Sequence, residues 1–107
     1  MIIYEINLTI ENEIFDDYYN WLIEHVKQML QFDGFNSCEI AKDNFIGEPQ
    51  YTKMIVRYML DSEENLNHYL TNFASKMREE GIHRFGNQFT ATRRVLVNVV
   101  KFRNNTN

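Results

Sequence analysis

Apolar and polar residues alternate near the start of the chain. Within residues 2–10 every second side chain is apolar, with Ile2, Tyr4, Ile6, Leu8 and Ile10 set against the polar Glu5, Asn7 and Thr9. Successive side chains of a strand point to opposite faces, so this alternation predicts a strand with one buried face. Alternation also predicts strands over 50–60 and 88–102, and residues 35–42 are expected to form a shorter fourth strand.

Two other segments repeat with the period of a helix. Over 14–32, apolar and aromatic residues cover an arc of roughly 200°, wider than a surface helix needs, which predicts burial against more than one surface. Over 62–80 they recur at helical spacing, with Asp61 as the expected N-cap and Gly81 as the expected C-terminal stop. We also expect a short turn of helix over 82–87 and a loop over 43–49.

The order of these elements, β-α-β-β-α-β, predicts an α+β protein with a ferredoxin-like fold, in which an antiparallel sheet carries both helices on one face. We expect a single domain over residues 1–103 and a frayed polar tail over 104–107. The other sheet face is left bare, and the alternation places Tyr51, Ile55 and Met59 on it. Because a small protein rarely exposes such a patch to water, we expect two copies to pack sheet to sheet as a homodimer.

The charge balance argues against nucleic acid as a partner. The 107 residues include 11 Lys and Arg against 15 Asp and Glu, a net charge of −4, which is the wrong sign for binding phosphate backbones. The segment 51–58 also lacks the glycine and the closely spaced aromatic residues with which RNA-recognition modules of this topology stack bases.

Cysteine content and hydropathy indicate a cytoplasmic protein. Cys38 is the single cysteine and has no partner for an internal disulfide, which suits a reducing compartment. The first residues lack the basic start and the long apolar run of a signal peptide, and no stretch approaches the roughly 18 apolar residues of a membrane span. We therefore expect no membrane partner.

A stretch near the C-terminus, Glu-Gly-Ile-His-Arg-Phe-Gly over 80–86 followed by Ala91 and Arg93, resembles the C-terminal signature of a bacterial family called domain of unknown function 4286. Residues 1–4, 21–25 and 34–35 also match that family's pattern. The resemblance implies a fold similar to the dimeric α/β-barrel proteins, a group that includes cofactor-free monooxygenases, haem-degrading enzymes and purely binding members. It implies no particular activity.

His25 is the leading candidate for chemistry. It lies inside the apolar arc of the first helix, one turn after Trp21, so its protonation should depend on its neighbours. Such a histidine can act as a general base, although a buried histidine more often only satisfies a hydrogen bond in the core. Arg93, on the last strand, can anchor an anionic group or instead pair with Glu5 or Glu39 on a neighbouring strand, as can Arg57.

Three aromatic residues complete the candidate pocket. We expect Trp21, Tyr51 and Tyr58 to line a small, mostly apolar space between sheet and helices, although aromatic residues at such spacing are more often plain core residues. The three histidines fall in separate elements without metal-ligand spacing, and the sequence lacks the glycine-rich motifs that bind nucleotides. We therefore expect neither a metal nor a nucleotide cofactor.

Two functions fit these features. In the first, the homodimer binds a small organic molecule in this pocket and can act on it without a cofactor, with His25 transferring a proton and Arg93 holding an anionic group. In the second, the protein is a non-catalytic interaction or regulatory module whose partner is a second copy of itself. The sequence leaves the choice between an enzyme and a binding module open.

Overall fold

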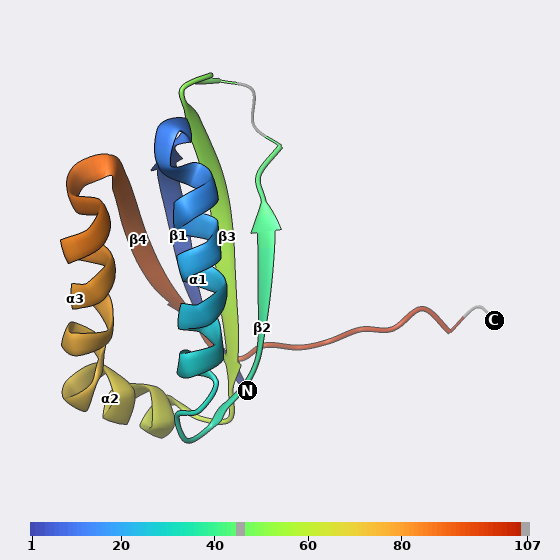
Figure 1. Cartoon of the computed structure of the whole chain (residues 1–107). Helices are drawn as coiled ribbons and strands as arrows, with labels where there is room; N and C mark the ends of the chain where they lie inside the picture. The colour runs from blue at the N-terminus through green and yellow to red at the C-terminus, as the bar shows by residue number, and fades with distance from the viewer. Residues whose placement is uncertain (45–46, 106–107) are drawn as a thin grey trace.

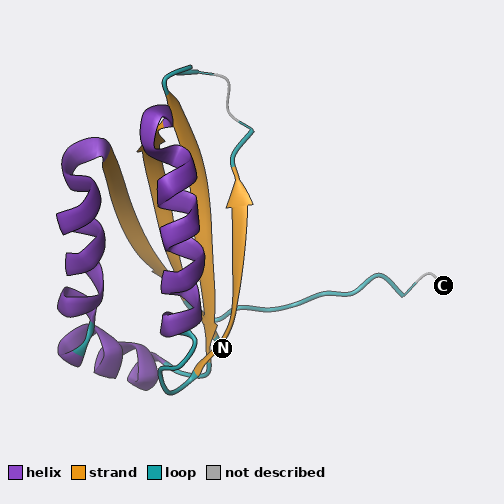
Figure 2. Cartoon of the chain, viewed as in Figure 1, coloured by secondary structure: helices purple, strands orange, loops and turns teal. Residues whose placement is uncertain are grey.

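The computed structural model describes residues 1–44 and 47–105. Within these residues, four strands and three α-helices follow one another, with two short 3-10 turns beside them (Figures 1 and 2). In chain order the elements are β1 (Ile2–Glu11), a 3-10 turn (Asn12–Ile14), α1 (Phe15–Met29), β2 (Phe35–Lys42), β3 (Tyr51–Leu60), α2 (Glu63–Asn72), α3 (Ala74–Phe85), a second 3-10 turn (Gly86–Gln88) and β4 (Phe89–Leu96).

The strands form one antiparallel sheet in the order β2-β3-β1-β4. Helices α1 and α3 lie side by side over the same face of this sheet (Figure 1). The predicted ferredoxin-like fold is therefore confirmed. No helix within the described residues combines the length and the apolar character that crossing a bilayer requires.

The core lies between the helices and the sheet. The apolar residues that alternate along β1 and β3 point toward the helices as predicted, and Ile10, Val56 and Leu60 are almost completely buried. On α1 the buried residues Tyr18, Leu22, Val26 and Met29 follow the expected helical period. The opposite face of the sheet, which no helix covers, is called the open face below.

The helix predicted over 62–80 is wrong in two respects. At Phe73 the backbone leaves the helical region, with φ of −130°, so that α2 and α3 are separate helices that meet at a steep angle (Figure 1). The N-cap of α2 is Ser62, whose hydroxyl accepts a hydrogen bond from the backbone N–H of Asn65. Asp61 is not the cap because its carboxylate accepts a hydrogen bond from the Asn36 side chain.

Gly81 does not end the second helical segment, contrary to expectation. Helix α3 continues to Phe85, and the next residue, Gly86, ends it with a positive φ of 55°. Gly81 is buried against Trp21 of α1, and a Cβ atom built on it would lie 2.8 Å from the indole ring. The glycine therefore permits close helix packing.

Strand β4 is shorter than predicted. It ends at Leu96 instead of residue 102, and Asn98 just beyond it adopts a left-handed φ of 56° that is incompatible with a continuing strand. The chain then runs away from the sheet and leaves Val100 and Phe102 exposed (Figure 1). Residues 45–46 of the predicted loop and residues 106–107 of the predicted tail lie outside the described residues.

Glu5 lies at the centre of the open face with a side chain only 1% exposed. Its carboxylate accepts hydrogen bonds from Arg57 at 2.8 Å and from Arg94 at 2.5 Å, on the two neighbouring strands. Cross-strand pairing of Arg57 is thus confirmed. Arg93 lies on the helix-covered face, in register with Ile6, and within the described residues it forms no ion pair with Glu5 or Glu39.

We expect a fall in pH to lower the free energy of unfolding, because it protonates the Glu5 carboxylate. The hydrogen bond from Arg94, with smaller help from Asn7 and Arg57 and against the effect of burial, lowers the pKa of Glu5 from 4.5 to about 2. A carboxyl group whose pKa is lower in the folded state stabilises the fold above its unfolded pKa, and that contribution is lost as the pH falls toward the folded pKa. Both arginines are partly exposed, so we expect solvent screening to limit the loss to about 2 kcal/mol between pH 4.5 and 2.

Urea titrations across this pH range would measure that loss. Glu5→Gln has no carboxyl group to protonate, so its free energy of unfolding should fall less on acidification than that of the wild type. Parallel pH profiles for the two proteins would show that Glu5 is not responsible.

Candidate functional site

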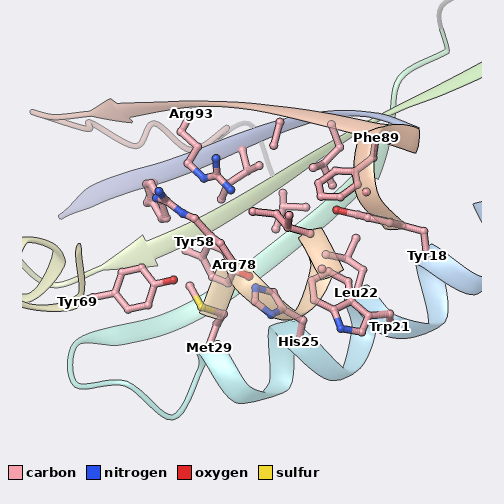
Figure 3. A pocket seen from close by; sticks show the side chains of 18 residues that line it. Tyr18, Trp21, Leu22, His25, Met29, Tyr58, Tyr69, Arg78, Phe89 and Arg93 are labelled. Atoms are coloured by element: carbon pink, nitrogen blue, oxygen red, sulfur yellow. The ribbon is translucent and has the colours of Figure 1, made fainter. Parts of the chain in front are cut away.

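A cavity of about 270 Å³ lies between the helix-covered face of the sheet and the three helices (Figure 3). Strands β1, β3 and β4 form one wall, and side chains of α1, α2 and α3 form the other. Most of the lining is apolar or aromatic, as in sites that bind small organic molecules. The polar groups come from one histidine, two arginines, four tyrosines and the Trp21 indole.

Four of the five residues predicted for the pocket line this cavity, and one does not. Trp21 and His25 reach it from α1, Tyr58 from β3 and Arg93 from β4 (Figure 3). Tyr51 lies on the open face at the start of β3, seven positions before Tyr58. An odd separation along a strand places two side chains on opposite faces, so Tyr51 and Tyr58 cannot line the same cavity.

His25 is held by stacking. Its ring lies over the Trp21 indole with the centroids 4.7 Å apart and the planes 22° apart. Burial lowers the pKa of His25 below its ordinary value of 6.5, with Glu80 raising it and Arg93 lowering it further. The imidazole is therefore mainly neutral near pH 7 and able to accept a proton. Within the described residues its ring nitrogens make no hydrogen bond to another side chain or to the backbone, and they are not sealed off from solvent.

Helix α3 fixes the position of Trp21, and thereby of His25. The indole Nε1 donates a hydrogen bond to the Glu80 carboxylate at 2.9 Å. The neighbouring Gly81 lets the two helices approach until the indole ring fills the space beside the α3 backbone. The hydrogen bond to Glu80 and the close contact with Gly81 together fix the orientation of the indole.

Two arginines face the cavity, and only Arg93 is predicted from the sequence. The second, Arg78 of α3, donates a hydrogen bond to the Tyr4 hydroxyl at 2.8 Å. It lies four residues after the buried Ala74 and three before the buried Gly81, spacing that puts it on the inward side of the helix. That spacing is the signal that could have identified it. Within the described residues, neither arginine forms an ion pair with a carboxylate.

Tyrosine hydroxyls supply further polar groups. Tyr4, Tyr18, Tyr58 and Tyr69 all line the cavity, and Figure 3 shows the last three around it. Tyr4 accepts the bond from Arg78, whereas the other three hydroxyls have no hydrogen-bond partner within the described residues. Burial raises the pKa of Tyr18 and Tyr58 strongly and that of Tyr69 to about 12, so all three stay protonated at neutral pH and can donate.

The side chains that bring a permanent charge to the cavity are all positive. Its lining residues include two arginines and no aspartate or glutamate. The nearest acidic influence on His25 comes from Glu80, which is engaged with Trp21. Within the described residues, no group of three histidine, cysteine or carboxylate side chains is arranged to hold a metal ion. The cavity therefore suits a ligand with an aromatic or apolar body and a negatively charged group.

A model of a known protein family matches most of the chain. A family model described as Domain of unknown function (DUF4286) matches residues 1–99. No curated protein matches the chain.

Similar solved structures share the fold at low sequence identity. A protein from Deinococcus radiodurans, provisionally described as an antibiotic biosynthesis monooxygenase, has a TM-score of 0.69 at 12% identity, covering 97% of this chain and 100% of that chain. A dimeric ferredoxin-like protein from an uncultured marine organism has a TM-score of 0.58 at 9% identity, with 92% and 98% covered. A dimeric ferredoxin-like protein of unknown function from Thermobifida fusca has a TM-score of 0.53 at 16% identity, with 90% and 92% covered.

Proposed function

The chain belongs to the DUF4286 family, and we propose that it binds a small organic anion in the cavity between its sheet and helices. The observation that carries this proposal is the presence of Arg78 and Arg93 in a cavity wall without a carboxylate. A guanidinium group with no counter-ion in the protein is free to form paired hydrogen bonds with a carboxylate or enolate. The aromatic side chains around it fit a ring or another flat conjugated body.

The same groups support proton transfer without a cofactor. A neutral His25 can remove a proton from an acidic carbon or hydroxyl of the bound molecule, so that the C–H or O–H bond breaks and an N–H bond forms on the imidazole. The electron pair left behind becomes an oxyanion, which Arg93 and the tyrosine hydroxyls can stabilise. The Deinococcus radiodurans protein, itself described as a monooxygenase, supports a small-molecule site in this fold without identifying the reaction.

We also propose that the protein forms a homodimer in which two copies pack through their open faces. Two similar structures are described as dimeric ferredoxin-like proteins. The open face of this chain carries partly exposed apolar side chains, among them Ile55 and Met59 of β3 and Leu96 of β4. A second copy would remove these side chains from water.

Binding of a charged and a neutral probe would test the anion site. We expect isothermal titration calorimetry at pH 7.5 to detect 4-hydroxybenzoate with a Kd below about 1 mM. The matched amide, 4-hydroxybenzamide, should bind at least about tenfold more weakly, because it loses one charge-assisted hydrogen bond of roughly 1.5 kcal/mol or more.

Equal affinity for the two probes would contradict an anion site. If no ring carboxylate binds and native mass spectrometry of the purified protein finds no retained small molecule, the non-catalytic self-associating module becomes the better description.

A further inference from the structure

The two ends of the cavity differ in their chemistry. Tyr18 lies at one end, where its ring packs against Phe89 with the centroids 4.9 Å apart. Tyr69 and Arg78 lie at the other end, on the opposite side of His25 (Figure 3). A molecule that fills the cavity therefore meets aromatic rings at one end and hydrogen-bond donors at the other.

Two guanidinium groups and a phenol hydroxyl converge at the second end. Arg78 reaches it from α3, Arg93 from β4 and Tyr69 from α2 (Figure 3). Burial raises the pKa of Tyr69 to about 12, whereas the positive charges of Arg78 and Arg93 act in the opposite direction. Both arginines therefore lie close enough to the Tyr69 hydroxyl for their charges to act on it.

The Tyr69 hydroxyl is directed into this space. The residue is only 3% exposed, yet its hydroxyl makes no hydrogen bond to the described part of the chain and is not sealed off from solvent. Arg78 donates one hydrogen bond, to Tyr4 at 2.8 Å, and the Arg93 side chain donates none to the described residues. Most donors at this end of the cavity are therefore available to a ligand.

The exposed residues of the lining show where the cavity opens. They are Ile82, Gly86 and Arg93. On α3, Gly81 contacts Trp21 of α1, and Ile82 lies about 100° further round the helix, on the side away from α1. The mouth therefore lies between α3 and β4, with Arg93 at its rim. An anion held there keeps part of its contact with water, which lowers the cost of removing its charge from solvent.

Two converging arginines match a doubly charged group better than a carboxylate. A carboxylate carries one negative charge and two oxygens, which a single arginine can satisfy through paired hydrogen bonds. A phosphate monoester carries nearly two negative charges near neutral pH and three terminal oxygens. It can pair with one arginine and still accept hydrogen bonds from the second arginine and from a tyrosine hydroxyl.

We propose that the charged group of the ligand is a phosphate monoester, bound by Arg78, Arg93 and Tyr69, with an aromatic or apolar body directed toward Tyr18. This inference rests on the anion site of the proposed function and names the class of its anion. The ester oxygen joins the phosphate to the body, which lies along His25 and the aromatic end of the cavity. The three terminal oxygens face the two guanidinium groups and the Tyr69 hydroxyl.

Two probes that differ by one charge would test the phosphate. Phenyl phosphate is close to doubly charged at pH 7.5, whereas methyl phenyl phosphate, in which a methyl group esterifies one oxygen, carries a single charge. In isothermal titration calorimetry, we expect phenyl phosphate to bind at least about tenfold more tightly than this diester and than 4-hydroxybenzoate. The reason is that it gains at least one further charge-assisted hydrogen bond.

The preference for the doubly charged probe should depend on both arginines. In Arg93→Gln one guanidinium group remains, and the ratio of the Kd values of the diester and phenyl phosphate should fall below about threefold. Arg78→Gln should have the same effect. Because this change also removes the hydrogen bond to Tyr4, circular dichroism must confirm its fold. If it is unfolded, Arg78→Lys replaces it, and the loss of the planar donor pair should still lower the ratio.

A change of one hydroxyl group would test the third donor. Tyr69→Phe keeps the ring and removes the hydroxyl, and it should weaken binding of phenyl phosphate by about tenfold. Tyr19→Phe removes the same group from an exposed position on α1 that does not line the cavity, so this matched control should bind phenyl phosphate as the wild type does. Equal affinities of the two variants would overturn the role of Tyr69.

The outcomes separate the phosphate from the anion site itself. If 4-hydroxybenzoate binds as tightly as phenyl phosphate, the phosphate is wrong and the anion site of the proposed function remains. Tighter binding of 1,4-benzenedicarboxylate than of phenyl phosphate would show that the two arginines hold separate carboxylates, which also overturns the inference. If none of these anions binds, the proposed function itself is disproved.

Discussion

Replacement of both cavity arginines, Arg78→Gln together with Arg93→Gln, should weaken binding of 4-hydroxybenzoate by about 100-fold or more. A hydrogen bond to a charged group contributes roughly 1.5–3 kcal/mol, and 1.4 kcal/mol corresponds to a tenfold change in Kd. Glutamine keeps much of the side-chain length but loses the charge and the paired donors of the guanidinium group. Isothermal titration calorimetry of the single and double variants would give the contribution of each arginine.

Two controls make this result specific to the cavity. Arg84→Gln removes the same charge from an exposed position on α3 that does not line the cavity, and it should leave the affinity unchanged. Affinity for the neutral 4-hydroxybenzamide should change much less in the double variant than affinity for the carboxylate. A similar loss in Arg84→Gln would point to a general effect of net charge, and an unchanged Kd in the double variant would disprove the anion site.

Gly81→Val should lower the free energy of unfolding by roughly 2–3 kcal/mol, as overpacking of a filled interior does. Intrinsic helix propensity would favour the opposite result, since glycine is the least favourable residue in a helix after proline. The built Cβ, however, would lie 2.8 Å from Cη2 and 3.2 Å from Cζ2 of Trp21, and valine adds two methyl groups beyond it. The indole must then turn away, which breaks its hydrogen bond to Glu80 and its stacking on His25.

A double-mutant cycle with Trp21→Ala would identify the source of the strain. Without the indole the space beside Gly81 is open, so Gly81→Val in that background should cost less than about 0.5 kcal/mol. Urea denaturation of the four proteins gives the coupling energy directly. An equal cost in both backgrounds would show that Trp21 is not the residue that requires a glycine at position 81.

Part of the candidate site could be predicted from sequence, because it depends on short-range periodicity. Trp21 and His25 are one turn apart on α1, so their appearance on the same inward arc follows from 3.6 residues per turn. Tyr58 and Arg93 follow in the same way from alternation along β3 and β4. The strict period of two also excludes Tyr51 from this group.

Arg78 and Gly81 show where local patterns are insufficient. A glycine after a run of helix has the same local pattern whether it ends the helix or lies against another one, and only Trp21, sixty residues earlier in the chain, decides between these roles. Arg78 lies at helical spacing from the buried Ala74, but its partner Tyr4 is 74 residues away along the chain, so only the tertiary structure brings the two together. The contact between Trp21 and Glu80 spans a similar separation.

The sequence by itself determined the four strands, the inward faces of β1, β3 and α1 and the ferredoxin-like order, because each depends on residues a few positions apart whose side chains must separate into buried and exposed sets. Only the tertiary structure decided which polar groups converge. The two arginines and the four tyrosines of the cavity come from different strands and helices, whose relative positions are set by packing between distant segments.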